Sequence, residues 1–376
     1  VGWKNATDLL VRPIDGTTLG TIADQGADVN PGPLLVADAT GRVAVQWMSN
    51  TVSGSRAIWS FSSSSFGTTS TFTASAGGDT YDWLASTSSG ALSVYPVFNS
   101  GVGGEQSTSG GWTSSGVSGA GTSNVAYGLR AASAFGAAPR AVIYWAYETG
   151  MLTLHVVTSP GTTSWTEAKR TISPSIPYAG NFAVAVYSNG DPFVAWDDKN
   201  HHLMGARYRV ATSLWDADQT IDTYAATPDA AGAKASLAID GSDHLTVAWT
   251  YFSNAGAAYH TAYRRDPGSG LGTHEELPGS SFASLVVDHV GTTYLLTREA
   301  IADAGANHVV VRRAGTSEAT FGPAGDTGIV CPPDTPGSTP SPSAVSFDDD
   351  NEPIVVGLDA NPSLSPANGV SATRCH

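Results

Sequence analysis

One short pattern recurs along the chain: an apolar strand, a polar turn, and a second apolar strand that often ends in an aromatic residue. Its clearest copies span residues 37–47, 186–196 and 239–249. Seven copies end at positions 47, 95, 145, 196, 249, 297 and 357, a step of about 50 residues that fits one four-stranded propeller blade. The repeat therefore predicts an all-β fold, a seven-bladed β-propeller of four-stranded antiparallel blades.

The spacing also predicts how the chain is organised. We expect a single propeller domain over residues 1–376, with blades starting near 33, 80, 126, 181, 234, 281 and 342. Residues 1–30 precede the first copy, and the last copy ends at its third strand. Residues 1–30 should therefore supply outer strands to the last blade, so that N- and C-terminal strands close the ring and remove free sheet edges. The Ser- and Gly-rich segments 60–75 and 100–123 are expected to form long loops or polar outer strands.

The amino-acid composition limits the classes of molecule that the protein is expected to bind. The 33 acidic residues outnumber the 18 basic ones, which gives a net charge of −15. A phosphate backbone would be repelled, so nucleic acid is not an expected partner. No apolar run reaches the roughly 18 residues of a membrane span. We expect a monomer that binds an extracellular glycan or polysaccharide.

Cysteine usage suggests the compartment. The two cysteines, Cys331 and Cys375, both lie in the last fifth of the chain, and lysine is scarce. The start at Val1 is typical either of a truncated chain or of a mature form after signal cleavage. We expect a secreted, extracellular or periplasmic protein, where a Cys331–Cys375 disulfide would form; two free buried thiols are the alternative.

An aspartate opens the turn in several copies. Asp38, Asp240, Asp288 and Asp348 each stand nine residues before the position at which the second strand ends. Aspartate at the start of a turn accepts hydrogen bonds from backbone amides two residues on. The repeated aspartate is therefore expected to be a turn residue, since catalysis requires one special residue.

The turn Asp38-Ala-Thr-Gly41, followed by a strand that ends at Trp47, resembles the blade repeat of sialidase-like propellers with Asp-box-type turns. The likeness covers most of the chain. A complete Asp box reads Ser-x-Asp-x-Gly-x-x-Trp, which no segment matches, and Val11-Arg-Pro-Ile14 differs from the Arg-Ile-Pro motif of sialidases. The resemblance implies kinship with secreted propellers that include glycan-binding lectins and polysaccharide lyases.

The loops between second and third strands are the expected place for a site, because they vary on a rigid scaffold. They carry Tyr147 and Glu148, the segment 197–202, Tyr251, and Arg298 with Glu299. The segment 197–202 is the richest, with Asp197, Asp198, Lys199, His201 and His202, and it can also be a plain polar hairpin.

Two chemistries remain open for that segment. Asp197 or Asp198 together with His201 or His202 could bind a divalent cation such as Ca²⁺ or Zn²⁺, with Asp197 and His201 the ligands expected. Alternatively, His201 or His202 is a general base while Lys199 or Arg298 neutralises a substrate carboxylate. Joined by Tyr147 or Tyr251, that set suits proton abstraction beside a uronate.

Other histidines and aromatic residues fit structural roles. His155, His260 and His308 lie on third strands and are expected to face sheet interfaces. Most tryptophans end equivalent strands and suit core packing, whereas Trp112 is irregularly placed and is a candidate exposed platform for sugar rings.

Three hypotheses of function follow. A lectin-like module predicts shallow aromatic sites, repeated between blades. A polysaccharide lyase or glycoside hydrolase predicts one deep site, with His201 or His202 and Tyr, Arg or Lys from neighbouring blades. The candidate ligand-binding residues are Glu148, Asp197, Asp198, Glu299 and Trp112. A structural surface protein predicts neither.

Overall fold

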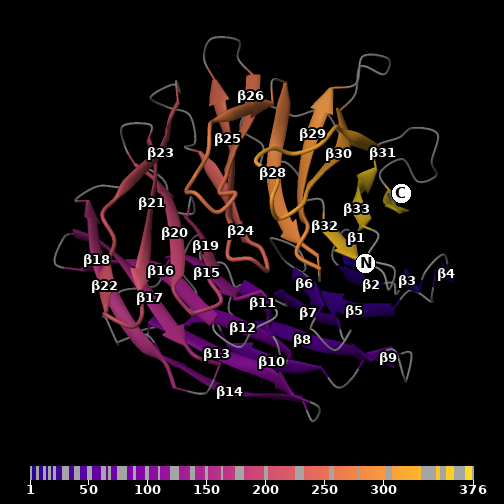
Figure 1. The fold of residues 1–376 in the computed structure, drawn as a ribbon. Helices are drawn as coiled ribbons and strands as arrows, with labels where there is room; N and C mark the ends of the chain where they lie inside the picture. Colours follow the sequence, from indigo (N-terminus) through magenta and orange to yellow (C-terminus); the bar gives the residue numbers. More distant parts are fainter. Residues whose placement is uncertain are drawn as a thin grey trace. The chain divides into compact units, whose positions relative to one another are not determined.

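The chain is all-β in a computed structural model (Figure 1). The structure describes residues 2–5, 8–11, 14–15, 18–19, 23–27, 34–37, 43–48, 53–60, 65–66, 69–73, 83–87, 90–97, 101–108, 111–118, 127–135, 140–148, 151–161, 164–173, 182–198, 202–224, 233–253, 258–277, 279–288, 290–300, 307–331, 344–347, 353–359 and 369–374. No helix among these residues is both long and apolar enough to span a membrane.

The strands form a succession of antiparallel sheets, and all but the first are made of consecutive strands. The first strands are β1 (Gly2–Asn5), β2 (Asp8–Val11) and β5 (Ala23–Ala27) in one sheet, and β3 (Ile14–Asp15) with β4 (Thr18–Leu19) in another. The next sheet holds β6 (Leu34–Ala37), β7 (Val43–Met48), β8 (Ser53–Ser60), β9 (Ser65–Phe66) and β10 (Ser70–Thr73).

Two four-stranded sheets follow. They comprise β11 (Trp83–Thr87), β12 (Gly90–Val97), β13 (Gly101–Thr108) and β14 (Gly111–Ser118), then β15 (Tyr127–Ser133), β16 (Arg140–Glu148), β17 (Met151–Ser159) and β18 (Thr166–Ser173). The Ser- and Gly-rich segment 100–123, expected to form long loops or polar outer strands, contains the inner strand β13 and the outer strand β14.

The remaining sheets repeat this order. They comprise β19 (Phe182–Val186), β20 (Pro192–Asp197), β21 (His202–Arg209), β22 (Leu214–Trp215) and β23 (Gln219–Thr223); then β24 (Lys234–Ile239), β25 (Leu245–Ser253), β26 (Ala258–Arg265) and β27 (Glu275–Leu277); then β28 (Ser280–Val287), β29 (Thr293–Ala300), β30 (Asn307–Ala314) and β31 (Gly325–Cys331); and finally β32 (Ala344–Phe347), β33 (Pro353–Asp359) and β34 (Gly369–Arg374).

The expected antiparallel, four-stranded sheets are therefore present. Among the described strands, β1, β2 and β5 pair with one another, as do β32, β33 and β34, and no closed sheet is found. The count of seven blades and the closure of a ring by terminal strands remain predictions.

The chain divides into two compact units. The first contains Val1–Gly180, Val184–Pro192 and Tyr208–Trp215, and the second contains Asn181–Ala183, Phe193–Arg207 and Asp216–His376.

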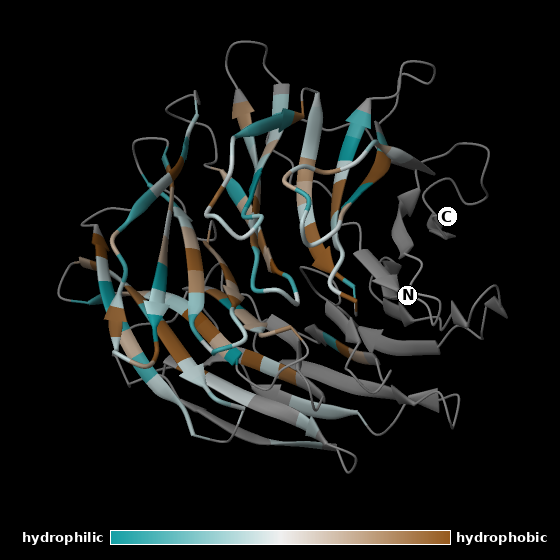
Figure 2. Cartoon of the chain, viewed as in Figure 1, coloured by the Kyte–Doolittle hydropathy of each residue, from teal (hydrophilic) through white to brown (hydrophobic). Residues whose placement is uncertain are grey.

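Neighbouring sheets pack through apolar side chains within each unit. In the first unit, Leu92 and Val94 of β12 share a buried cluster with Val142 and Tyr144 of β16. In the second, Ala248 of β25 and Leu295 of β29 belong to one cluster. Figure 2 shows brown, hydrophobic stretches within the strands. The second strand of a sheet is packed on both faces, so β20 is buried along its whole length.

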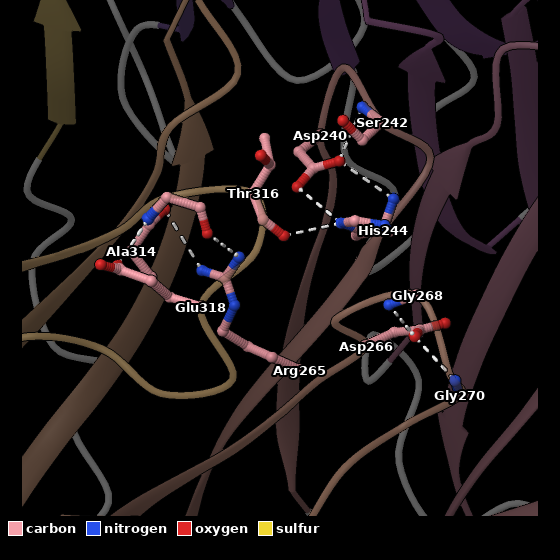
Figure 3. Close-up of polar contacts among 11 residues, drawn as sticks. Asp240, Ser242, His244, Arg265, Asp266, Gly268, Gly270, Ala314, Thr316 and Glu318 are labelled. Carbon is pink, nitrogen blue, oxygen red and sulfur yellow. Dashed lines mark hydrogen bonds and ion pairs between the residues drawn. The ribbon is translucent and has the colours of Figure 1, made fainter.

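The aspartate turns hold the β24–β25 and β28–β29 connections. One Asp240 oxygen accepts hydrogen bonds from the amides of Ser242 and His244, at 2.9 and 3.0 Å (Figure 3). Asp288 does the same for the amides of Val290 and Thr292. The geometry confirms the structural role that the sequence predicts for these two aspartates.

A buried arginine ties two sheets together beside this turn. Arg265 at the end of β26 donates to the carbonyls of Ala314, the last residue of β30, and of Gly315, which follows it (Figure 3). His244 donates to the carbonyl of Thr316 at 2.7 Å. Sheets β24–β27 and β28–β31 are therefore joined by polar contacts as well as by their shared core.

Candidate functional site

Histidines occupy one equivalent position in three successive sheets. Each histidine lies on the third strand of its sheet. Its partner, on the second strand or directly after it, comes two residues after the end of the sequence repeat, which falls at positions 196, 249 and 297. His202 lies opposite Asp198 through a backbone hydrogen bond of 2.9 Å, His260 pairs with Tyr251, and His308 pairs with Glu299. We call these six residues the histidine edge. Figure 1 shows the neighbouring ends of β25, β26, β29 and β30 within the second unit.

The first pair is a partly exposed histidine held by a carboxylate. Asp198 accepts from the backbone amide of His202 at 2.9 Å and from its Nδ1 atom at 3.0 Å. This double contact fixes the ring at the start of β21. A carboxylate on Nδ1 leaves Nε2 as the free ring nitrogen, the arrangement used by metal-binding and general-base histidines.

The second pair lies within a cluster of three side chains. Tyr251 and His260 stack with ring centroids 5.5 Å apart, and one oxygen of Glu276 on β27 accepts from both. The distances are 3.2 Å from the Tyr251 hydroxyl and 2.7 Å from His260 Nδ1. Burial, followed by the charges of Glu276 and Asp222, raises the pKa of Tyr251 to about 12, so its hydroxyl is a hydrogen-bond donor at neutral pH.

The third pair carries an ion pair instead. Glu299 binds Arg312 of β30 through both carboxylate oxygens, with 2.9 Å between Nη2 and Oε2, and it also accepts from the Thr297 hydroxyl. Arg298, the next residue to Glu299, is only 3% exposed. Its guanidinium lies 5.9 Å from the ring centre of Phe282.

A buried tyrosine connects the first two pairs. The Tyr224 hydroxyl donates to Asp197, which also accepts from the amide of Ala233 at 2.6 Å. The Tyr224 ring lies 5.3 Å from that of Tyr251. The segment that begins at Asp197 is therefore linked to Tyr251 on the adjoining sheet.

Other residues singled out from sequence lie elsewhere or outside the described part. The side chain of Tyr147 and all of Lys199 and His201 are outside the described residues, as are Cys375 and the side chain of Cys331. Glu148 ends β16 in the first unit and forms an ion pair with Lys169 at 2.8 Å. Trp112 lies on β14, partly buried, in the first unit. The expected disulfide stays a prediction.

The first unit contains a buried version of the tyrosine–histidine–glutamate cluster. His155 stacks on Tyr144 with centroids 4.4 Å apart, and Glu167 accepts from both at 2.7 Å. His155 is fully buried, as expected from sequence. His260, which the sequence also predicts to face a sheet interface, has a side chain that is 25% exposed, and its partner Glu276 on the short outer strand β27 is also at the surface.

The described residues do not form a metal site. No group of three or more histidine, cysteine, aspartate or glutamate side chains in the described part is arranged to hold an ion. Asp197, one of the predicted ligands, is 5% exposed and is engaged by Tyr224 and Ala233.

Sequence reasoning missed Glu276, Tyr224 and Phe282. Glu276 and Tyr224 lie in outer or connecting segments, whose position opposite Tyr251 depends on how the sheets pack. The Thr-His-Glu-Glu run at 273–276 was the available signal, since it places titratable groups on an outer strand.

No family model matches the chain, and no curated protein sequence matches it. Among solved structures it is similar to AofleA from Arthrobotrys oligospora, with 14% identity, 78% of this chain and 84% of that chain covered, and a TM-score of 0.45. It is also similar to the SapL1 lectin in complex with alpha methyl fucoside, with 13% identity, 80% and 94% covered, and a TM-score of 0.44. A third similar structure is the intramolecular trans-sialidase from Ruminococcus gnavus, with 12% identity, 91% of this chain and 93% of that chain covered, and a TM-score of 0.44. At these identities and scores, the similarities assign neither a fold nor an activity to this chain.

Proposed function

We propose that the chain is a secreted, lectin-like protein that binds extracellular carbohydrate at the histidine edge. The proposal includes the seven-bladed propeller expected from the repeat, with this edge on the face opposite the aspartate turns. Its ligand is a glycan or polysaccharide.

The observation that carries the proposal is the pair of partly exposed, carboxylate-held histidines at equivalent positions. Asp198 holds His202, and Glu276 holds His260. Each pair offers carboxylate oxygens as acceptors and an imidazole nitrogen that can donate or accept, which matches the hydroxyl groups of a sugar. Tyr251 and His260 add stacked rings with polar edges, a surface that suits the mixed apolar and polar faces of a pyranose.

Repetition favours binding over a single catalytic centre. The same histidine position recurs in three successive sheets, whereas an enzyme concentrates its chemistry in one constellation. Side chains already held by hydrogen bonds also lose less freedom on binding.

The test is a direct binding measurement on a panel of neutral and acidic polysaccharides, followed by calorimetry with retained ligands. We expect His202→Ala and His260→Ala each to weaken binding about tenfold or more, a loss of about 1.4 kcal/mol. His244→Ala is the matched control, because it removes a carboxylate-paired histidine from the aspartate turn of the same unit. A chain that retains no glycan, or edge variants that bind like the unsubstituted protein, would overturn the proposal.

The second candidate is a polysaccharide lyase or hydrolase. Its support is the orientation of His202 by Asp198, which suits a general base. His201, Lys199, Tyr147 and Arg298 remain candidates for the accompanying roles. Unsaturated uronate or new reducing ends, produced by the unsubstituted chain and lost in His202→Ala, would favour this candidate.

A further inference from the structure

Phe282 has a backbone conformation that a phenylalanine rarely adopts. Its φ is 60°, in the left-handed region, where Cβ of an L-residue crowds the following carbonyl. The pairing of β28 with β29 shifts between Ser281 and Ser284, which marks a bulge around this residue. Glycine is the usual residue at a left-handed bulge position, because it has no Cβ.

The other non-glycine residues of the described part with positive φ are of a different kind. Ser213 and Asp243 lie in turns, where small polar side chains bond locally and tolerate this conformation. Phe282 lies within a strand and has a bulky side chain, so its backbone stores strain without that local compensation.

Packing on an arginine does not account for the strain. The Arg298 guanidinium covers Phe282 at 5.9 Å. Three similar contacts occur at 5.0 to 5.5 Å, and none of their aromatic residues is among those with positive φ: Arg140 with Trp165, Arg170 with Trp215, and Arg265 with Phe321. An arginine–aromatic contact can therefore form on ordinary backbone.

The bulge lies beside the histidine edge. The carbonyl of Ser280, two residues earlier, accepts from the hydroxyl of Thr261, which follows His260. Ser280 also pairs with Glu299, which lies opposite His308. Ser280 thus contacts residues next to two histidine positions of the edge, and Phe282, two residues further along β28, is partly exposed although Ser280 and Ser281 are buried.

We propose that Phe282 is a ligand-contacting residue, whose ring is the platform on which the apolar face of a bound pyranose stacks. This inference rests on the proposed carbohydrate function. A bulge re-aims a side chain, and strain in a binding site persists when the side chain is needed there. The buried Arg298 supports the ring from behind and keeps it in place.

The experiment compares Phe282→Ala, Phe282→Gly and Phe282→Tyr by calorimetry with a glycan that the unsubstituted chain binds. We expect alanine and glycine to weaken binding tenfold or more, and tyrosine to retain it within about threefold, because a ring is kept. Melting should occur at a higher temperature for the glycine variant than for the alanine variant, because glycine adopts the left-handed conformation freely. Trp215→Ala is the matched control, since it removes an arginine-covered aromatic residue on ordinary backbone from the first unit.

The outcomes separate this inference from the proposed function. A chain that binds no glycan overturns the function. A chain that binds glycan equally well after Phe282→Ala overturns only the role of Phe282. If the alanine and glycine variants fail to fold, Phe282→Leu keeps apolar volume but removes the flat ring, and unchanged affinity in that variant also overturns the inference.

Discussion

Tyr251, His260 and Glu276 repeat, at a surface, an arrangement that Tyr144, His155 and Glu167 form inside another sheet. In both clusters one glutamate oxygen accepts from the tyrosine and the histidine, and the two rings stack. Tyr144 comes one residue before the end of its sequence repeat at position 145, and Tyr251 comes two residues after the end of its repeat at position 249. Because side chains alternate between the two faces along a strand, the two clusters lie on opposite faces of their sheets. The cluster around His155 is buried and has a structural role, whereas the cluster around His260 is partly exposed, so a ligand can reach it.

The Tyr251 phenol predicts a dependence of stability on pH. Its pKa is raised to about 12 in the folded protein, against about 10 in an unfolded chain. Between these values the unfolded chain has lost a proton that the folded chain retains. The contribution of Tyr251 to stability is thus complete below about pH 10 and is lost as pH rises toward about 12.

Tyr251→Phe should therefore flatten the fall in the free energy of unfolding between about pH 9 and about pH 11. Urea denaturation at both pH values measures this slope. Burial also raises the pKa of Tyr144, Tyr224 and Tyr263, and these remain in both proteins, so the difference isolates Tyr251. A phenolate absorbance difference between the two proteins with a midpoint near pH 10 would contradict the expectation.

At the scale of elements, the sequence repeat predicts strands better than it predicts their outer neighbours. The β24–β25–β26 meander follows from its apolar alternation, its Asp240 turn and its Trp249, which are all local features. The outer edge of the sheet that contains β21 is made of two short strands, β22 and β23. The amide of Asp216 still bonds to the carbonyl of Arg207. Pairing with β21 resumes at Gln219 opposite Gly205, so the interruption lies between Asp216 and Gln219.

The residues of the candidate site also fall into those that the sequence predicts and those that it does not. Asp198, His202 and Tyr251 were identifiable because they flank recognisable hairpins. Glu276 was not, because its contact with His260 depends on the register of a three-residue outer strand. The left-handed backbone of Phe282 has no signal in sequence, because left-handed positions are normally marked by glycine or asparagine.

Gly205 provides a test of how tightly the middle of β21 is packed. A Cβ at this position would lie 2.6 Å from Cζ of Phe193 and 2.8 Å from Cδ1 of Ile221. We expect Gly205→Ala to lower the free energy of unfolding by about 1–3 kcal/mol, the usual cost of overpacking. Gly325→Ala is the control, because its Cβ would meet one backbone oxygen at an ordinary 3.5 Å. Equal stability of the two variants, measured by urea denaturation, would show that β21 is loosely packed.

At the scale of the whole molecule, the net negative charge affects the stability of the entire chain. Acidic residues exceed basic ones by 15, from 33 and 18, so the folded chain repels itself. Individual ion pairs such as Arg312–Glu299 offset this only locally. Exposed charges interact over a screening length of about 30 Å at 0.01 M salt and about 8 Å at 0.15 M.

Sodium chloride should consequently stabilise the protein at neutral pH. We expect the melting temperature, followed by scanning calorimetry, to rise by about 2–4 °C between these salt concentrations, as a gain of about 1 kcal/mol produces in a large domain. The same titration at a pH near the isoelectric point of 4.8 is the control, because net repulsion vanishes there and the rise should disappear. A melting temperature that falls with salt at neutral pH would mean that favourable ion pairs outweigh repulsion, and the acidic surface would then be better organised than its net charge implies.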